Sequence, residues 1–179
     1  MARMIETSRL ILRPLELSDA TRMAPLMRAP EIARMSSSIP NVQPEIGAEG
    51  YILITQARAA LKREHVFAVD LPGEGLIGVA SAHVGREFVE IGYWIGKPYW
   101  DRGYGTEVAR AIAEYAASLD AGKVIAFHFA DNPISGRVLE KAGFADSGET
   151  RDLFSLSRAA TVPSRLMTFS ADSTHAKAA

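Results

Sequence analysis

A pair of glycines between a strand-like and a helix-like segment constrains this chain more than any other feature. Gly103 and Gly105 lie in the stretch Trp100–Glu107; the apolar run Phe88–Ile95 precedes it, and the helix-like run Val108–Leu119 follows. Glycine lets the backbone turn and approach a bulky ligand without a Cβ penalty. A helix N-terminus offers unpaired N–H groups and a positive dipole end, which suit a pyrophosphate. The pattern predicts a strand, a phosphate-binding turn and a helix, although a tight connection alone also accounts for two such glycines.

Two better-known phosphate motifs do not fit this turn. A Walker loop ends in glycine, lysine and serine or threonine, whereas Gly105 is followed by Thr106 and Glu107. The dinucleotide fingerprint needs a third glycine where Val108 stands, and its turn follows the first strand of the domain. Here the turn comes after several strands. Any phosphate is therefore held by a different kind of turn.

Composition narrows the class of protein. The chain has 179 residues, enough for one domain with a sizeable core, and its net charge of −1 indicates no nucleic-acid or polybasic membrane surface. Cysteine is absent, which excludes disulfides, thiolate metal sites and a cysteine nucleophile. The sequence has neither a signal-peptide pattern nor an apolar run of the roughly 20 residues that a membrane helix needs. We expect a cytoplasmic protein with one domain over residues 1–172 and a disordered tail over 173–179.

Apolar periodicity predicts strands and helices alternating along one mixed sheet. The expected strands cover residues 9–15, 65–70, 76–84, 88–95, 123–129, 144–156 and 165–170. Helices are expected after Ser18, from Pro44, after the glycine turn, and from Asn132 to a C-terminal stop at Gly143. The segment from residue 30 to 44 is expected to be irregular. In the helix from Pro44 one apolar face is predicted, made of Tyr51, Ile54, Ala57 and Leu61.

The element order and three sequence blocks resemble the GNAT superfamily of acetyl-coenzyme A-dependent N-acetyltransferases, and within it the bacterial branch that acetylates ribosomal-protein N-termini, such as an N-terminal alanine. The blocks are Glu6–Leu15, Glu90–Ile95 continuing to Glu107, and Asn132–Ser135 continuing to Phe144. The resemblance implies an α/β (α+β) fold: a mixed, mostly antiparallel sheet of about seven strands, with helices on both faces and a splayed central strand pair. It implies acetyl-coenzyme A as cosubstrate.

The resemblance also assigns residues to the coenzyme. The backbone of Tyr93, Trp94 and Ile95 would hydrogen-bond the pantetheine arm, and Asn132 and Ser135 would lie where the thiol end enters. The pyrophosphate would bind the backbone amides of Arg102, Gly103, Tyr104, Gly105 and Thr106. The family pattern begins with glutamine or arginine three residues before the first glycine, where this chain has Trp100. Asn132 is equally explained as a helix N-cap, and both roles can coexist.

Acetyl transfer to an amine requires a neutral amine, a stabilised oxyanion and a stabilised thiolate. A backbone N–H near Trp94 is the expected oxyanion donor. Glu90, on the strand leading to the cleft, is the expected acceptor of the amine proton, unless it is an ordinary solvated strand residue. The family's tyrosine acid, seven residues after the asparagine, is replaced by Leu139. Ser135 is predicted to stabilise the thiolate instead, with Tyr93 and Tyr104 as weaker alternatives.

The four histidines show no paired spacing, so we expect no metal. His128 is expected to be packed, with a smaller chance of contacting the acceptor. We predict transfer of acetyl to a primary amine, a protein or peptide N-terminus, by direct attack in a ternary complex. Acceptor choice is expected to lie in Ala29–Glu45 and Glu149–Arg165. The alternatives are a small-molecule acceptor (a polyamine, amino acid or antibiotic) and a coenzyme A-binding module with weak catalysis. A homodimer is also expected.

Overall fold

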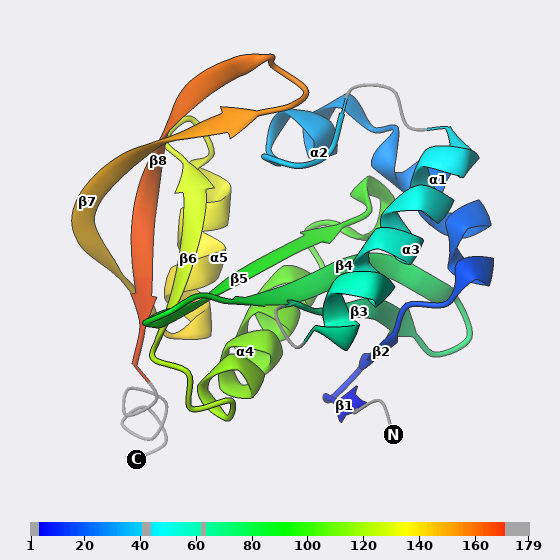
Figure 1. Cartoon of the computed structure of the whole chain (residues 1–179), viewed down its shortest axis with the longest axis horizontal. Helices are drawn as coiled ribbons and strands as arrows, with labels where there is room; N and C mark the ends of the chain where they lie inside the picture. Colours follow the sequence, from blue (N-terminus) through cyan, green and yellow to red (C-terminus); the bar gives the residue numbers. More distant parts are fainter. Residues whose placement is uncertain (1–3, 41–43, 62–63, 171–179) are drawn as a thin grey trace.

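The computed structural model describes residues 4–40, 44–61 and 64–170, and these form one eight-stranded sheet with helices on both faces (Figure 1). The strand order in space is β1-β2-β3-β4-β5-β6-β8-β7. All neighbouring strands pair antiparallel except β5 and β6, which are parallel. The strands are β1 (Ile5–Glu6), β2 (Ile11–Pro14), β3 (Glu64–Leu71), β4 (Gly75–Val84), β5 (Phe88–Ile95), β6 (Lys123–Phe129), β7 (Phe144–Ser155) and β8 (Ala160–Phe169).

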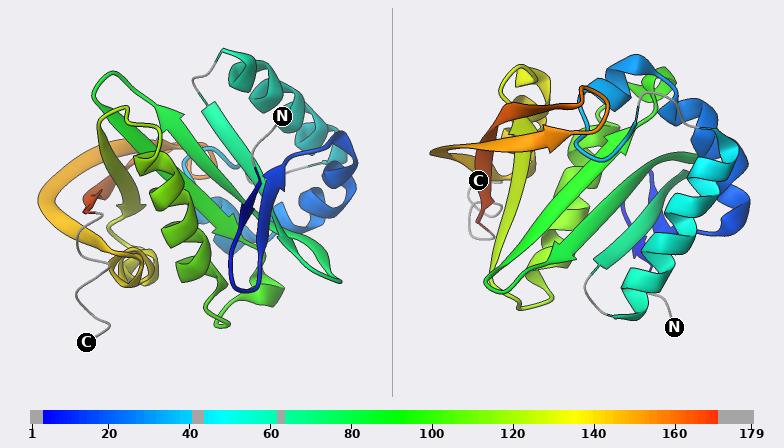
Figure 2. Two further views of the ribbon diagram at one scale, coloured as in Figure 1. Left: turned by 90° about the horizontal axis from the view of Figure 1, so that it is seen from below. Right: turned by 45° about the horizontal axis from the view of Figure 1, so that its top comes forward.

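The helices divide between the two faces of the sheet. One face carries α1 (Ala20–Met27), α2 (Pro30–Arg34) and α3 (Glu45–Ala60), and the other carries α4 (Tyr104–Ala117) and α5 (Pro133–Ala142). Short 3-10 turns lie at Leu17–Asp19 and Lys97–Tyr99. Figure 2 shows α3 and α4 on opposite sides of the sheet. The mixed, mostly antiparallel sheet with helices on both faces is therefore confirmed.

Each face of the sheet has its own apolar core. Val89, Ile91 and Ile95 of β5 pack with Val108 and Ile112 of α4 in the larger core. The smaller core lies under α1 and α3, and Trp94 packs against its edge. Because successive side chains of a strand point to opposite faces, Tyr93 lies on the α4 and α5 face, whereas Glu90 and Trp94 lie on the α1 to α3 face.

The two parallel strands separate partway along their length. Pairing of β5 with β6 ends at Ile91 and Ala126, although β5 continues to Ile95 and β6 to Phe129. Beyond this point each strand keeps one partner: β5 stays paired with β4, and β6 with β8. The expected splayed pair is confirmed, and we call the open space between its arms the fork.

The sequence-based predictions fail at three places. The segment expected to be irregular contains α2, which begins at Pro30. The predicted apolar face of α3 is wrong, because Ile54 is 54% and Leu61 71% exposed. The buried residues of that helix are instead Ala48, Ile52 and Thr55. Ile52 and Thr55 each come one position after a residue of the predicted face. Alanine and threonine add little to a hydrophobic pattern, so the exposed isoleucine and leucine dominated it. The two-residue strand β1 was not predicted, and the predicted tail at 173–179 lies outside the described residues.

Among the described helices, none is both long and apolar enough to cross a membrane.

Candidate active site

The glycine turn places the N-terminus of α4 beside the fork. Gly103 is the N-cap residue and has a φ of +79°, in the left-handed region that glycine adopts without strain. Gly105 has an ordinary helical position. A Cβ built on it would point into the space between α4 and α5, 3.6 Å from Val138 Cγ1 and 3.8 Å from Tyr93 Cε2. The two glycines therefore differ in kind, since Gly103 shapes the turn and Gly105 allows α4 to pack closely against Val138 and Tyr93.

The N-terminal segment holds this turn from outside. The Arg9 guanidinium donates to the backbone carbonyl of Arg102 at 2.9 Å and forms a salt bridge with Glu107 at 2.7 Å, and it lies over the Tyr104 ring. The Glu107 carboxylate also accepts hydrogen bonds from the Thr7 hydroxyl (2.6 Å), the Ser8 hydroxyl (2.9 Å) and the Arg9 amide (2.8 Å). Burial alone would raise the Glu107 pKa, but these bonds lower it below its ordinary value. Glu107 therefore stays charged and fully bonded within the first turns of α4.

Trp100 anchors the same turn to the end of β5. Its indole N–H donates to the carbonyl of Ile95 at 2.6 Å. Trp100, which stands where the family pattern has glutamine or arginine, therefore has a hydrogen-bond partner in the backbone of β5. The turn is fixed at both ends, by Trp100 on β5 and by Arg9 on Arg102.

The free edge of β5 faces the fork with specific backbone groups. The Gly96 amide donates to the carbonyl of Ile77 in β4 at 2.8 Å, so in the antiparallel alternation the Trp94 amide also points to β4. The Tyr93 and Ile95 amides then point away from β4, into the fork. The backbone amides next to Trp94 that face the fork are therefore those of Tyr93 and Ile95.

The start of α5 lies on the same face of the sheet as the α4 turn. The Asn132 side chain accepts a hydrogen bond from the Ser135 amide at 3.2 Å, so Asn132 is the N-cap that the sequence indicated. Ser135 lies beside the Tyr93 side chain. Leu139, where the commoner family pattern has tyrosine, is 1% exposed and belongs to the core.

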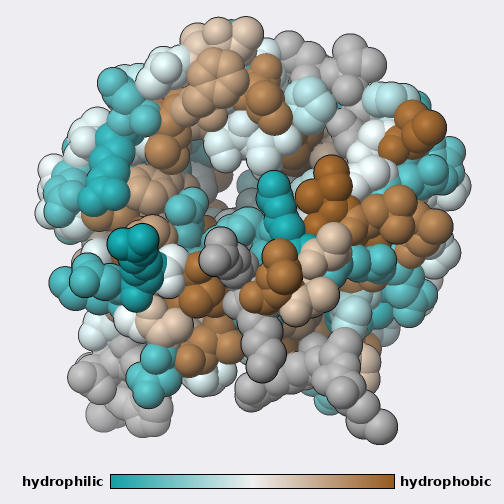
Figure 3. Space-filling view, in the orientation of Figure 1, coloured by the Kyte–Doolittle hydropathy of each residue, from teal (hydrophilic) through white to brown (hydrophobic). Residues whose placement is uncertain are grey.

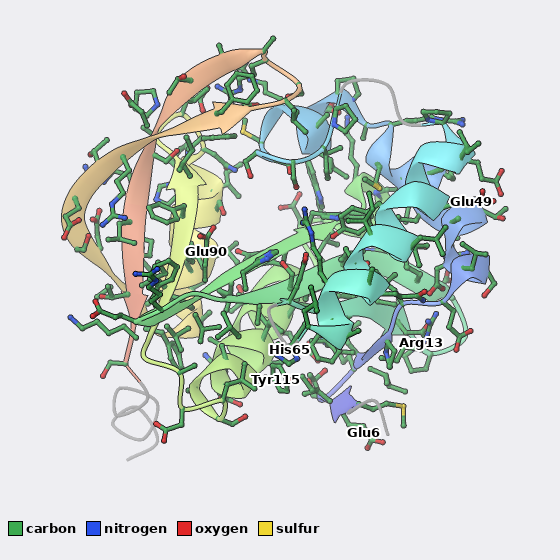
Figure 4. All side chains as sticks on the ribbon, in the orientation of Figure 1. Glu6, Arg13, Glu49, His65, Glu90 and Tyr115 are labelled. Carbon is green, nitrogen blue, oxygen red and sulfur yellow. The ribbon has the colours of Figure 1, made fainter. Side chains whose placement is uncertain are left out.

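Glu90 lies on the opposite face of β5, next to the point where the strands separate. It is partly buried, and burial raises its pKa above the ordinary value, while His83 on β4 acts in the opposite direction. His83 Nδ1 lies 3.6 Å from the buried Glu64 carboxylate of β3, which also pairs with Arg58. Figure 4 shows Glu90 near β6, at the lower edge of the gap between β5 and β6. A carboxylate with a raised pKa is a stronger base than an ordinary one.

The two segments predicted to select the acceptor meet over this face. The Ser157 hydroxyl donates to the carbonyl of Ala33 at 2.8 Å, and the Leu156 amide donates to Ser37 at 3.0 Å. The Arg158 guanidinium bonds the Arg34 carbonyl and both carboxylate oxygens of Asp131, at 2.9 and 3.1 Å. Arg34 pairs with the same carboxylate. We call these contacts between α2, the β7–β8 hairpin and Asp131 the roof.

An opening passes through the molecule at the fork (Figure 3). In the view of Figure 1 it lies between β6, α2 and β5. The side with α4 and α5 carries the turn, Tyr93 and Ser135, and the other side carries Glu90 at the closed end of the fork and the roof at its far end. His65 and Tyr115, whose side chains hydrogen-bond at 2.9 Å, lie away from the opening (Figure 4). His128 faces α5, against Gly136, which agrees with the expectation that it is packed.

Sequence reasoning missed the residues that support this site. It assigned no chemical role to Arg9 and Glu107, although Arg9 lies in the first block of the resemblance. It also missed the contacts of Asp131 with Arg34 and Arg158. Arg9 and Glu107 are 98 residues apart, and Arg34 and Asp131 are 97 residues apart. Asp131 and Arg158 are 27 residues apart. Such pairs leave no local pattern in a single sequence.

Comparisons with known proteins agree with this geometry. Residues 9–145 match the acetyltransferase (GNAT) domain family. The chain is 31% identical over 155 residues to the uncharacterized N-acetyltransferase YoaA of Bacillus subtilis (strain 168), covering 82% of this chain and 85% of that protein. In fold it is similar to RimJ of Mycobacterium smegmatis in complex with CoA-disulfide (TM-score 0.83, 18% identity, 97% and 90% covered). It is also similar to RimL, a ribosomal L7/L12 alpha-N-protein acetyltransferase in complex with coenzyme A (TM-score 0.80, 13% identity, 93% and 97% covered).

The chain therefore belongs to the GNAT family and is an N-acetyltransferase. Its residues fit an acetyl-coenzyme A cosubstrate in three respects. The α4 N-terminus offers its first backbone amides, β5 offers an edge that is unpaired beyond Ile91, and the start of α5 lies beside Tyr93 on the same face. Bound there, the coenzyme supplies the acetyl group as a thioester. No cluster of three or more potential metal ligands occurs in residues 4–40, 44–61 and 64–170.

The difference between the two glycines gives the first prediction. Gly105→Ala should leave stability unchanged or raise it by up to about 1 kcal/mol, because alanine is the better helix residue and its Cβ meets only ordinary contacts. It should weaken acetyl-coenzyme A binding at least about tenfold, because the methyl group enters the space beside the turn. Calorimetric titration and thermal unfolding measure both effects.

Gly103→Ala is the comparison. Because Gly103 has a φ of +79°, an alanine at this position should lower the free energy of unfolding by about 1–2 kcal/mol. Wild-type affinity in a folded Gly105→Ala variant would contradict the assignment of this space to the coenzyme.

The contacts of Arg9 give the second prediction. Arg9→Ala should weaken coenzyme binding severalfold, because the Arg102 carbonyl loses its donor, Glu107 loses its salt bridge and the turn is held less firmly. Stability should fall by no more than about 1 kcal/mol, since the Arg9 side chain is exposed. Titration with coenzyme A measures the change, and Arg86→Ala, on the β4–β5 turn, is the matched control. Equal affinity in the two variants would make Arg9 a surface residue only.

Proposed function

We propose that this enzyme transfers acetyl from acetyl-coenzyme A to the α-amino group of a protein or peptide N-terminus. The observation that carries the proposal is the opening at the fork (Figure 3), which has the α4 turn on one face and both Glu90 and the roof on the other. An extended N-terminus can enter such an opening with its amine foremost. The L7/L12 acetyltransferase, which has the same fold, acts on an alpha-N position, and this is consistent with the proposal.

The proton on the acceptor amine also favours an N-terminus over a lysine or a polyamine. At pH 7 roughly one tenth of α-amino groups are neutral, since their pKa is about 7.7–8.0, against about 0.04% of lysine side chains with a pKa near 10.4. Glu64, His83 and Glu90 lie side by side across β3, β4 and β5. They are titratable side chains of the described residues near the point where β5 and β6 separate. One carboxylate with a raised pKa suits an amine that is already partly neutral.

The residues act in sequence on the two substrates. Glu90, directly or through a water, accepts the proton of the acceptor ammonium. The neutral nitrogen then attacks the thioester carbonyl carbon, and the amides of Tyr93 and Ile95 donate hydrogen bonds to the oxyanion. The carbon–sulfur bond breaks and its electron pair stays on sulfur. The nitrogen gives up its second proton to water and the thiolate takes one from water, so that the neutral amide product and coenzyme A leave. The roof orients the acceptor and restricts access of water.

The choice of acceptor gives the third prediction. A short peptide with a free N-terminus and an internal lysine should release coenzyme A thiol, whereas the same peptide with an acetylated N-terminus should not. Spermidine and free amino acids should react more slowly than the free peptide. Thiol release with a colorimetric reagent measures all of these. Faster turnover of a small amine would support the small-molecule alternative. Coenzyme binding without turnover of any amine would support a binding module.

The position of Glu90 gives the fourth prediction. Glu90→Gln should lower kcat by a factor on the order of 10² to 10⁴ near pH 7, with coenzyme affinity unchanged. The deficit should shrink towards pH 9, because an α-amine with a pKa of about 8 is then neutral without a base. Glu87→Gln, on the neighbouring turn, is the control. A wild-type rate in Glu90→Gln over this pH range would return Glu90 to the role of a solvated strand residue.

A further inference from the structure

Helix α3 is apolar on two opposite sides. Its inner side packs Ala48 and Ile52 against the sheet, in the smaller core. Its outer side carries four large apolar side chains that are 54% to 74% exposed: Ile46, Leu53, Ile54 and Leu61. A helix that is apolar all round is normally covered on all sides. The described part of the chain leaves the outer side of α3 uncovered.

Spacings of three and four residues place these side chains on one face, together with Gly50 and Ala57. We call the residues at positions 46, 50, 53, 54, 57 and 61 the α3 stripe. Hydrophobic residues gather in Figure 3 where α3 lies in Figure 1. Other exposed large apolar residues belong to elements of the candidate site, among them Trp100, Ile134 and Phe154. The six stripe residues are not part of that site, and an exposed apolar patch of this kind marks an interaction surface.

The residue sizes along the α3 stripe read the same from both ends. The small residues Gly50 and Ala57 lie at equal distances on either side of the midpoint between positions 53 and 54. The large residues Ile46 and Leu61 lie at equal distances further out. In an antiparallel pair of α3 helices with a two-fold axis at this midpoint, large side chains meet large ones and small residues meet small ones. The stripe is therefore complementary to a second copy of itself, as an isologous interface requires.

Gly50 supports this arrangement independently. It lies in the regular interior of α3, where glycine is less stable than alanine. A Cβ built on Gly50 would meet no heavy atom within 4 Å, so packing within the described chain does not call for glycine there. In the antiparallel pair Gly50 faces the partner's Ala57, and the absence of a side chain lets the two helix backbones approach closely.

The charges of α3 are also compatible with an antiparallel pair. Glu49 and Arg58 are nine residues apart, which is two and a half turns, so they lie on opposite flanks of the helix. In the pair each of them stays about 14 Å along the axis from its own copy. This distance exceeds the screening length of ~10 Å, so like charges do not oppose the contact. The two helix dipoles run in opposite directions, whereas a parallel pair would align them unfavourably.

We propose that α3 forms the interface of a homodimer, in which two α3 stripes pack antiparallel about a two-fold axis between Leu53 and Ile54. Leu53 then faces the partner's Ile54 at the centre of the contact. A single helix pair buries less than the ~1,600 Å² of a standard interface, so the expected dissociation constant lies in the micromolar range, about 1–100 µM. The proposal depends neither on the coenzyme site nor on the acceptor.

Sedimentation analysis from about 1 µM to about 1 mM protein tests the interface. Wild type should pass from monomer to dimer over this range. Leu53→Glu should raise the dissociation constant at least about tenfold, because it places two carboxylates in the apolar centre of the contact. Phe154→Glu is the control, since Phe154 is 56% exposed against 54% for Leu53 but lies on the β7–β8 hairpin. Its dissociation constant should equal that of wild type.

Gly50→Leu separates an interface from a merely exposed helix face. Leucine is the better helix residue and its side chain would enter open space, so the melting temperature of the monomer should not fall. The dissociation constant should nevertheless rise at least about tenfold, because the leucine side chain keeps the two backbones apart. A residue without an interface role would leave the association unchanged.

Cross-linking through single cysteines tests the direction of the pair in this cysteine-free chain. Ile46→Cys protein and Leu61→Cys protein are mixed and treated with a short bismaleimide linker. The antiparallel pair brings position 46 of one chain beside position 61 of the other, so the mixture should give a cross-linked dimer. Two copies of position 46 are about 22 Å apart along the axis, so the Ile46→Cys protein alone should stay uncross-linked.

Three results would overturn the proposal. A wild-type chain that stays monomeric at about 1 mM would mean that the stripe binds a different partner. Equal association of wild type and Leu53→Glu would place the dimer contact elsewhere, and loss of the dimer in Phe154→Glu alone would place it at the hairpin. Cross-linking of Ile46→Cys with itself would indicate a parallel pair. These measurements use neither coenzyme nor acceptor, so the dimer and the proposed function can fail separately.

Discussion

The separation of β5 from β6 beyond Ile91 and Ala126 is the constraint on which the site depends. Each arm remains stable because it keeps a full antiparallel partner on its outer side, β4 for one and β8 for the other. On the inner side the backbone groups of both arms lose their sheet partners. Buried backbone groups need hydrogen bonds, so the fork favours a ligand that offers them. The amide-rich pantetheine arm of the coenzyme is such a ligand.

Support for the turn at α4 comes from distant parts of the chain. Glu107 would repel a pyrophosphate if it were free, but Arg9 and two hydroxyls from the N-terminal segment neutralise and orient it. Arg9 at the same time takes up the Arg102 carbonyl, so that the amides of the turn remain directed outward. The first strand segment and the coenzyme turn are thus one structural unit, although nearly 100 residues separate Arg9 from Glu107.

The sequence predicted the parts of this structure that depend on local patterns. The β5 and β6 boundaries, the Asn132 cap and the Gly143 stop follow from apolar runs and from cap residues, which act over a few positions. The face of α3 was wrong because its buried side is made of small and polar residues such as Ala48 and Thr55. The roof and the Arg9 contacts could not be predicted, because they form between segments that only the fold brings together. The sheet position of Glu90 was predicted, whereas its raised pKa depends on burial that the sequence does not express.

The two-residue repeat of β5 explains how one strand can serve both substrates. Glu90 and Trp94 point to the face with α1 to α3, Tyr93 points to the face with α4 and α5, and the amides of Tyr93 and Ile95 lie between them in the plane of the sheet. Side chains on both faces and free amides between them can therefore come from six consecutive residues without crossing the core. A shift of one residue in the pairing of β5 with β4 would exchange the faces, burying Glu90 against α4 and turning Tyr93 away from the coenzyme. The apolar residues Val89, Ile91 and Ile95 oppose that shift, since it would move all three out of the larger core. The packing that stabilises the sheet thus also fixes which reacting group each side chain can reach.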